Sequence, residues 1–454
     1  MFDAVIVGGG AAGALVAIRL LTGAGPAPRV AIVEPDALLA RGAAYSTDGP
    51  EHLLNVVAAR MSAIAEEPDH FVRFLARDGQ GEATALADGF ARRRDYGCYL
   101  RDTLDAAPAR DALVHVVDRA SGVERAGDGF DVHLASGRRL RAAHVVLALG
   151  NAPRPLPGYL LHEGIRLAEA WDYDAVRAIA PDAEVCILGS GLSMVDAALS
   201  LAHGGHRGRI HVLSRHGLMP LPHARTGPQH GADVDGLLPL GVRARWHELR
   251  RRVDEAVAAG EPWQWSFDRL RHHGQALWRS LDDGERRRFL RHAVRHWDIH
   301  RHRIAPQAAA QLEALRASGQ LQVVAGRLRS ITADPAGGSC VHYRPRQGER
   351  EHMRHAGWIV NATGVETNID LRPGALLQAL RARGLVLPGP QGLGIASHGI
   401  GRVVDGRGRP DPRLFVLGAL RIGDLWESIA IPELRGQARD IAGAILAAPL
   451  PAQR

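Results

Sequence analysis

Two apolar runs along the chain lead into glycine-rich turns and then into patterns typical of helices. Residues 5–7 precede the turn 8–13, and residues 185–188 precede a similar turn that starts at residue 189. A buried strand that passes through glycines into a helix is typical of dinucleotide binding, because the N–H groups of the helix then face the phosphates. The pattern predicts two α/β units and therefore two bound nucleotides.

The first turn carries the three glycines that a bound pyrophosphate requires. Gly8 permits the tight turn, Gly10 lets the backbone approach the phosphates, and Gly13 lets the helix pack on its strand. The next predicted strand, 29–33, delivers Glu34 about 20 residues past the last glycine, where an acidic residue receives ribose hydroxyls. A carboxylate there would repel a 2′-phosphate. We therefore assign the first unit to FAD.

The second turn keeps Gly189 and Gly191, which serve the phosphates, but Met194 replaces the third glycine. The strand that follows ends in Ser214 and Arg215, where the first unit has its acidic residue. A guanidinium forks onto phosphate oxygens, so this pair favours NADPH over NADH. An ordinary solvated arginine remains the alternative for Arg215, because the chain is rich in arginine.

Composition agrees with a soluble globular protein of two or three domains, since 46% of the 454 residues are hydrophobic. The formal charge of +7 does not indicate nucleic-acid binding, because the arginine runs 92–94 and 286–288 lack interleaved aromatic residues. The N-terminus has no basic, apolar leader, and no apolar run approaches the roughly 18 residues of a membrane span. We expect no membrane segment and a cytoplasmic location.

The three cysteines, Cys98, Cys186 and Cys340, lie far apart in the sequence, and none belongs to a CxxC pair. A dithiol centre of the usual close spacing is therefore not expected, which separates the chain from disulfide reductases with two nucleotide units. Electrons must leave a bound flavin by another route.

Two apolar runs that end in glycine mark the expected crossings between units. The run 145–150 is followed by Pro153 and Pro155, which stiffen the chain, and 360–364 is its counterpart on return. We expect two Rossmann-like domains, the first of them discontinuous. The expected ranges are 1–153 for the first part of an FAD domain, 154–362 for an NADPH domain, and 363–454 for the closing part of the FAD domain.

Residues of about 218–311 depart from this pattern and predict a helical insertion in the second unit. Insertions of this kind commonly help to form a substrate pocket, because ligand sites favour domain interfaces. Its end, 291–303, alternates arginine with histidine. His296 and His300 could share a helical face and bind a metal, but the surrounding arginines oppose a cation, so we predict no metal site. Solvated histidines, or contacts to an anionic substrate or to NADPH phosphate, remain open.

Several further segments resemble one family. They are 41–47, 52–56, 61–63, 69–71, 360–364, 417–427 and 431–435. Together they resemble the FAD/NAD(P)-binding proteins related to class B flavin monooxygenases, among them the N-hydroxylating amino-acid oxygenases and a flavoprotein urate hydroxylase. The resemblance runs from Met1 to about Gln437 and implies that Gly364 and Gly418 help to bind the cofactors.

The resemblance also implies an activity. NADPH would reduce the flavin, which would react with dioxygen to a C4a-hydroperoxide and hydroxylate a small polar or anionic substrate containing nitrogen. Tyr45, His52 and Asn55 are the candidates for polar groups near the flavin, with a structural role as the alternative for His52. A flavin reductase that passes electrons to a quinone or a partner protein, and a non-catalytic redox sensor, are the rival interpretations.

Overall fold

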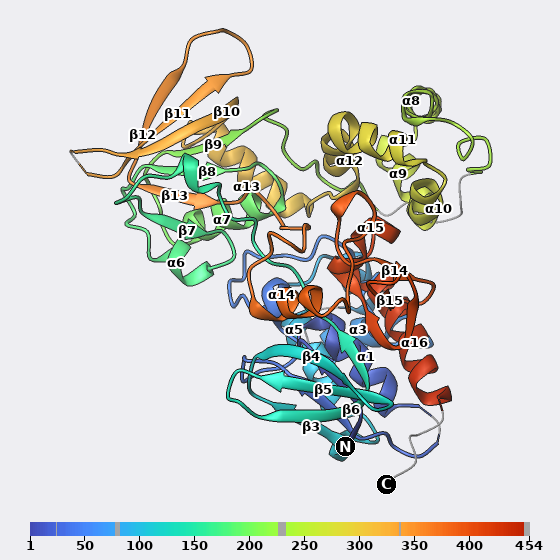
Figure 1. The fold of residues 1–454 in the computed structure, drawn as a ribbon. Coiled ribbons are helices and arrows are strands. Elements are labelled where there is room, and N and C mark those ends of the chain that lie inside the picture. Colours follow the sequence, from blue (N-terminus) through green and yellow to red (C-terminus); the bar gives the residue numbers. More distant parts are fainter. Residues whose placement is uncertain (24, 78–81, 226–232, 336, 449–454) are drawn as a thin grey trace.

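The computed structural model describes residues 1–23, 25–77, 82–225, 233–335 and 337–448. Within these residues, the strands form two mixed sheets, each with a parallel central part and helices packed on it, and a group of helices lies apart from both (Figure 1). This arrangement confirms the expected α/β class with two Rossmann-like units. Residues 226–232 of the expected insertion lie outside the described residues.

The first sheet combines the N-terminal part of the chain with a C-terminal segment. Its order is β14-β15-β16-β6-β1-β2-β3, and β5 pairs with both β4 and β6. The strands are β1 (Phe2–Val7), β2 (Val30–Val33), β3 (Leu113–Val116), β4 (Ala120–Ala126), β5 (Gly129–Leu134), β6 (Arg139–Leu147), β14 (Ser397–His398), β15 (Arg402–Val404) and β16 (Pro410–Val416).

Apolar residues on both faces of this sheet are buried, as expected for parallel strands. One face packs against α1, α3, α5 and α16, and the other packs against the β4–β5 hairpin and α14. The helices of this part are α1 (Ala11–Leu21), α2 (Gly42–Tyr45), α3 (His70–Arg77), α4 (Ala83–Asp88), α5 (Arg93–Asp105), α14 (Ala375–Ala382), α15 (Ile422–Leu425) and α16 (Ile431–Ala447).

The second sheet has the order β12-β11-β10-β9-β8-β13-β7. The five strands β10, β9, β8, β13 and β7 run parallel to one another, and β11 and β12 are added at the β10 edge in antiparallel pairs. Its strands are β7 (Leu167–Glu169), β8 (Val185–Leu188), β9 (Ile210–Ser214), β10 (Leu321–Ala333), β11 (Ser339–Pro345), β12 (His352–Ala356) and β13 (Trp358–Asn361), and α6 (Tyr173–Arg177), α7 (Leu192–His203) and α13 (Pro306–Ala317) accompany them. Short 3₁₀ turns are η1 (Ala58–Arg60), η2 (Arg110–Ala112), η3 (Gly158–Leu160), η6 (Pro390–Gly392) and η7 (Gly418–Arg421).

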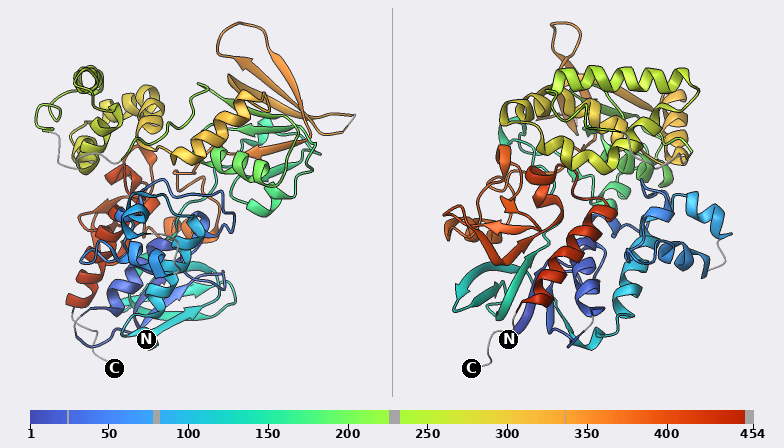
Figure 2. Two further views of the ribbon diagram at one scale, coloured as in Figure 1. Left: turned by 180° about the vertical axis from the view of Figure 1, so that it is seen from behind. Right: turned by 90° about the vertical axis from the view of Figure 1, so that its right-hand side faces the viewer.

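The helical insertion has apolar clusters of its own, separate from the cores of the two sheets. Trp426, from outside the insertion, packs on one of them, and its ring stacks on Trp278 at 4.9 Å. Figure 2 shows these helices over the C-terminal segment, beside the second sheet. They are α8 (Val242–Ala258), α9 (Trp263–Leu270), η4 (Arg271–His273), α10 (Gly274–Arg279), α11 (Asp283–Arg288), the π-helical turn η5 (Phe289–Ala293) and α12 (Val294–Arg301). Helix α13, whose first half falls within the range expected for the insertion, packs on the second sheet instead.

Candidate functional site

The first glycine loop lies between β1 and α1, and two of its glycines are required by the fold itself. Gly8 has a φ of +106°, and a Cβ built on it would lie 2.3 Å from the carbonyl oxygen of Ala148. A Cβ on Gly13 would lie 2.0 Å from the carbonyl oxygen of Gly8, so α1 can approach β1 only without a side chain there. The packing of the chain itself therefore requires glycine at both positions, whether or not a ligand binds.

Gly10 differs because it faces almost open space. The nearest atom to a Cβ there would be the Cα of Gly42, at 3.4 Å. Helix α1 starts at the next residue, with no acidic side chain in its first turn. The loop therefore fits a pyrophosphate at the N-terminus of a helix, in a space that a side chain would fill. Glu34 lies beside it, because its carboxylate accepts a hydrogen bond from the N–H of Gly9 at 2.7 Å.

The second glycine loop repeats this geometry between β8 and α7. Gly189 has a φ of +105°, and its Cβ would lie 2.2 Å from the carbonyl oxygen of Ala362, whereas a Cβ on Gly191 would meet no atom within 4 Å. Met194, in place of a third glycine, is fully buried in the core of the second sheet. The side of the loop at Gly191 is therefore as open as the side of the first loop at Gly10, and this loop also fits a pyrophosphate.

Ser214 and Arg215 lie next to this loop. The hydroxyl oxygens of Ser190 and Ser214 are 2.8 Å apart, and the N–H of Gly217 donates to Ser214 Oγ at 3.0 Å. Burial and the charges of Arg295, Arg154 and Arg327, in that order, lower the pKa of Arg215. Arg215 therefore lies in a strongly cationic environment rather than beside a carboxylate.

A pocket of about 470 Å³, which we call the arginine pocket, is lined by Arg215 and Arg327, whereas Arg295 and Arg154 line a larger cavity described below. It lies between the second sheet and the insertion, and no Asp or Glu is among the residues that line it. These residues are Arg215, His216, Arg291, His292, Arg327, Arg329, Arg344, Pro345 and Arg346. Such a pocket fits an anion. Of this set, sequence reasoning singled out Arg215 and the run 291–303.

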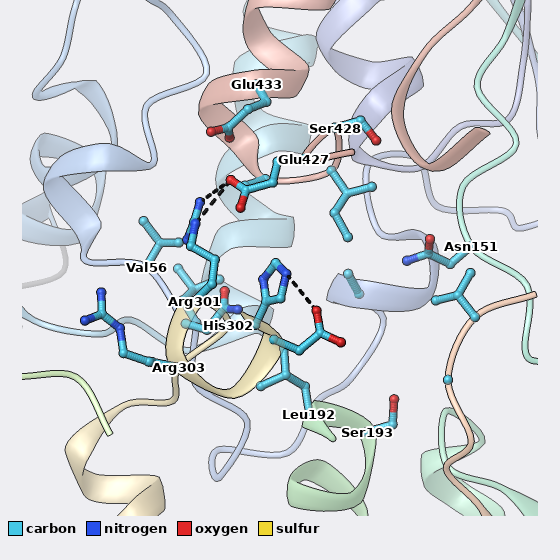
Figure 3. Close-up of a pocket in the computed structure, with 18 of the residues that line it drawn as sticks. Val56, Asn151, Leu192, Ser193, Arg301, His302, Arg303, Glu427, Ser428 and Glu433 are labelled. Atoms are coloured by element: carbon cyan, nitrogen blue, oxygen red, sulfur yellow. Dashed lines mark hydrogen bonds and ion pairs between the residues drawn. The ribbon is translucent and has the colours of Figure 1, made fainter. Parts of the chain in front are cut away.

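A larger cavity of about 650 Å³, the central cavity, lies where both nucleotide units and the insertion meet. Residues after β6 and β13, the start of α7, helix α12 and the segment between α15 and α16 all contribute to its lining. Figure 3 shows side chains from these elements converging on it. A site between domains is the usual place for a small-molecule ligand.

Three ion pairs line the central cavity on the side of the insertion. Arg301 donates to Glu427 at 2.8 Å (Figure 3), Arg271 pairs with Glu433 at 3.2 Å, and Arg303 pairs with Asp268. Sequence reasoning did not single out Arg271, and it included Glu427 and Glu433 only in the segments that resemble the family, without a role in the site. Two of these pairs join residues more than a hundred positions apart, so no spacing in the sequence could reveal them.

Burial shifts the titration of several groups that line the cavity. It lowers the pKa of His302, whose Nε2 lies 3.8 Å from a carboxylate oxygen of Asp298, and it raises the pKa of Asp298. Burial, followed by the charge of Arg303, lowers the pKa of His223 to about 4. These histidines are therefore neutral at neutral pH, and the positive charge of the cavity comes from its arginines.

The structure separates the three residues that the sequence suggested near the flavin. Tyr45 and Asn55 line the central cavity, but His52 does not. His52 is buried between the units, with Nδ1 2.5 Å from Thr47 Oγ1 and Nε2 2.9 Å from Ser200 Oγ. Both ring nitrogens of His52 are thus engaged by protein side chains, which favours the structural alternative, and its place beside the flavin stays a prediction.

The two glycines implied by the family resemblance lie in different surroundings. Gly364 has a φ of +102° and lines the central cavity, and a Cβ on it would meet no atom within 4 Å. Gly418 has a φ of +74° and is buried, and its N–H donates to Gln437 Oε1 at 3.0 Å. Gly364 leaves space for a ligand, whereas Gly418 packs against the last helix.

One family model matches part of the chain, and several solved structures share its fold. A family model described as FAD-NAD(P)-binding matches residues 5–152, so this part of the chain is an FAD-NAD(P)-binding domain. No curated protein matches the chain in sequence. Within the described residues, no helix is both long and apolar enough to cross a membrane, and no three His, Cys, Asp or Glu side chains are grouped to hold a metal ion.

Solved structures share the fold over nearly the whole chain. The ornithine N-hydroxylase of Kutzneria sp. 744, solved with reduced FAD, NADP⁺ and L-ornithine, is 15% identical with a TM-score of 0.69, covering 98% of this chain and 99% of that one. L-lysine 6-monooxygenase from Pseudomonas syringae is 17% identical, with a TM-score of 0.65 and the same coverages. Thioredoxin reductase of Lactococcus lactis is 12% identical, with a TM-score of 0.55 and 98% of both chains covered. The chain thus has the fold of flavin-dependent oxidoreductases with two nucleotide-binding units.

Proposed function

We propose that the chain is an FAD- and NADPH-dependent monooxygenase that hydroxylates a small polar or anionic substrate containing nitrogen. The observation that carries the proposal is the central cavity, which both nucleotide units and the insertion line together. The names of several neighbours in fold, which are hydroxylases of ornithine, lysine and cadaverine, support a substrate containing nitrogen.

The residues of the two glycine loops would hold the cofactors. Gly8, Gly10, Gly13 and Glu34 would bind FAD, whereas Gly189, Gly191, Ser214 and Arg215 would bind NADPH, and Gly364 and Gly418 would assist from the segments that close the units. Bound FAD would supply the redox chemistry, by accepting hydride from NADPH and activating dioxygen. The chain itself would position the reactants and exclude water from the cavity.

The charges of the cavity wall favour an anionic group on the substrate. Arg271, Arg301 and Arg303 are each paired with a carboxylate, but arginines, Arg60 among them, outnumber Asp and Glu by eight to five among the residues that line the cavity. Burial and then the charge of Arg271 lower the pKa of Arg60, as expected where cations crowd together. A carboxylate on the substrate would relieve that repulsion.

The positions of the cysteines support oxygen rather than sulfur as the electron acceptor. Cys98, Cys186 and Cys340 are all free, and no cysteine is among the residues that line the central cavity. A disulfide reductase needs a thiol pair that meets its flavin. The cavity offers arginine, carboxylate and aromatic side chains instead.

Labelled dioxygen tests the proposal. Candidate amines, amino acids and purines are screened for stimulation of NADPH oxidation, and the product is analysed by mass spectrometry. We expect a product heavier by one oxygen atom that derives from dioxygen. Label from water alone, or one peroxide per NADPH with every substrate class, would instead favour a flavin reductase.

A further inference from the structure

The arginine pocket has two walls that belong to different parts of the molecule. One wall is the second sheet, which contributes Arg215 after β9 and further arginines along β10 and β11. The other wall is the π-helical turn η5 of the insertion, which contributes Arg291 and His292. Because both walls are cationic, they repel each other unless an anion lies between them.

Backbone register places two of these arginines in an unfavourable pair. Arg327 of β10 lies directly opposite Arg344 of β11 in the antiparallel ladder. Like charges at directly opposite positions destabilise a sheet. Among the described residues, no Asp or Glu lines this pocket, and the charges that shift the pKa of Arg215 are all those of other arginines. An unfavourable pair at the wall of a pocket without acidic residues indicates that a bound anion supplies the missing negative charge.

We propose that Arg291 and His292 of the insertion complete the site for the 2′-phosphate of NADPH, so that this phosphate bridges the insertion to the second sheet. The proposal rests on the proposed use of NADPH. A phosphate monoester carries about −1.5 to −2 charges at pH 7 and three acceptor oxygens, enough for donors from both walls. NADH, which lacks this phosphate, would leave the walls apart.

The bridge also connects cofactor binding to the central cavity. Arg215 lines both the arginine pocket and the central cavity. Helix α12, which follows η5, supplies Val294, Arg295 and Asp298 to the wall of the central cavity. Drawing η5 toward the second sheet therefore moves part of that wall. NADPH would close the substrate cavity as it binds, whereas NADH would not.

Calorimetry with adenosine 2′,5′-diphosphate and 5′-AMP tests the site on the full chain loaded with FAD. Neither probe carries nicotinamide, so the result does not depend on the reaction that the protein catalyses. We expect Arg291→Ala to weaken binding of the diphosphate by about tenfold and to leave 5′-AMP unchanged within about twofold. Arg287→Ala is the matched control, because Arg287 is an exposed arginine of the same insertion that does not line the pocket.

Hydrogen exchange of the unmodified protein tests the bridge without a variant. The diphosphate, but not 5′-AMP, should slow exchange in peptides that cover residues 289–301. Unchanged exchange in these peptides would overturn the bridge, and so would an Arg291→Ala protein that binds the diphosphate as tightly as the parent. Either result would do so even if Arg215→Ala loses its preference for NADPH, because that preference tests the proposed function and not the bridge. Equal affinity of the parent for both probes would instead remove the proposed preference for NADPH itself. Inorganic phosphate that competes as strongly as the diphosphate would also overturn the assignment to the cofactor.

Discussion

The Arg93 guanidinium donates to both carboxylate oxygens of Asp196, at 2.6 and 3.0 Å, and this contact joins the two nucleotide units. Arg93 begins α5 beside the first sheet, and Asp196 lies in α7, the helix that starts at the second glycine loop. Burial opposes the charge on Arg93, but Asp196 outweighs it, so the pKa of Arg93 lies above its ordinary value. The contact fixes the second loop relative to the first unit.

Asp196→Asn should therefore destabilise the protein. Removing one partner of a buried ion pair leaves the other charge without compensation and costs about 3 kcal/mol. Urea unfolding would measure the change in the free energy of unfolding. In the double variant Arg93→Met with Asp196→Leu, which leaves no uncompensated charge, most of the loss should be recovered. A single variant as stable as the parent would show that this contact does not hold the units together.

The first glycine loop gives a second prediction. Gly10→Val should keep the fold, because a Cβ at this position approaches no protein atom closer than 3.4 Å, but the protein should lose FAD, because the side chain fills the pyrophosphate space. Flavin absorbance per protein and the thermal unfolding midpoint measure the two effects. Gly443→Val, at an exposed position in α16, is the control and should retain FAD. A Gly10→Val protein that binds one FAD per chain would contradict the assignment of the loop.

Much of this fold could be predicted from the sequence because its signals are local. Gly8 and Gly189 are each required by a positive φ and by a backbone carbonyl oxygen that would lie only 2.2 to 2.3 Å from a Cβ at that position. The surroundings of the cavity could not be predicted in the same way. Arg271 meets Glu433 across a sequence separation of 162 residues, and only the packing of the insertion on the C-terminal segment brings them together. The position of His52 relative to Asn55 likewise depends on where α7 packs.

Arg215 provides a third prediction, on cofactor choice. Loss of one charged hydrogen bond costs about 1.5 to 3 kcal/mol, so Arg215→Ala should raise the KM for NADPH by about tenfold to a hundredfold and leave that for NADH nearly unchanged. Steady-state rates with both cofactors measure this. Arg209→Ala removes the same charge just before the other end of β9 and should preserve the preference. Equal losses for both cofactors would contradict the contact.

His223 makes stability depend on pH. Its pKa is about 4 in the folded protein and near 6.5 when unfolded, so the unfolded chain binds the proton more tightly. Stability is therefore full above about pH 6.5 and falls as the pH drops toward 4, by about 2.5 kcal/mol between pH 7 and pH 4.5. Other buried histidines act in the same direction, so the test compares the parent with His223→Gln. The variant should lose less stability over this range, and parallel pH profiles would exclude His223 as a source.

Asn55 and His52 stand only three positions apart, yet their surroundings differ, and one pair of variants can test whether their roles differ too. Asn55 lines the central cavity, whereas His52 is enclosed between the units and hydrogen-bonded to Thr47 and Ser200. A polar group in the cavity can stabilise oxygen chemistry at a bound flavin, but an enclosed histidine can act only through the fold.

We therefore expect Asn55→Leu to raise the rate at which NADPH is oxidised to peroxide in air without substrate. The loss of one hydrogen bond, about 1 kcal/mol, corresponds to about fivefold in rate, while the KM for NADPH should stay within about twofold. His52→Gln should lower the thermal unfolding midpoint and leave this rate unchanged, because its side-chain partners Thr47 and Ser200 lie outside the cavity lining and its contact with Asp196 is to the backbone carbonyl oxygen. Peroxide formation, NADPH consumption and thermal unfolding measured on both variants separate the two roles. The opposite outcome, in which His52→Gln raises the rate and Asn55→Leu only destabilises the protein, would mean that the flavin binds on the other side of this segment.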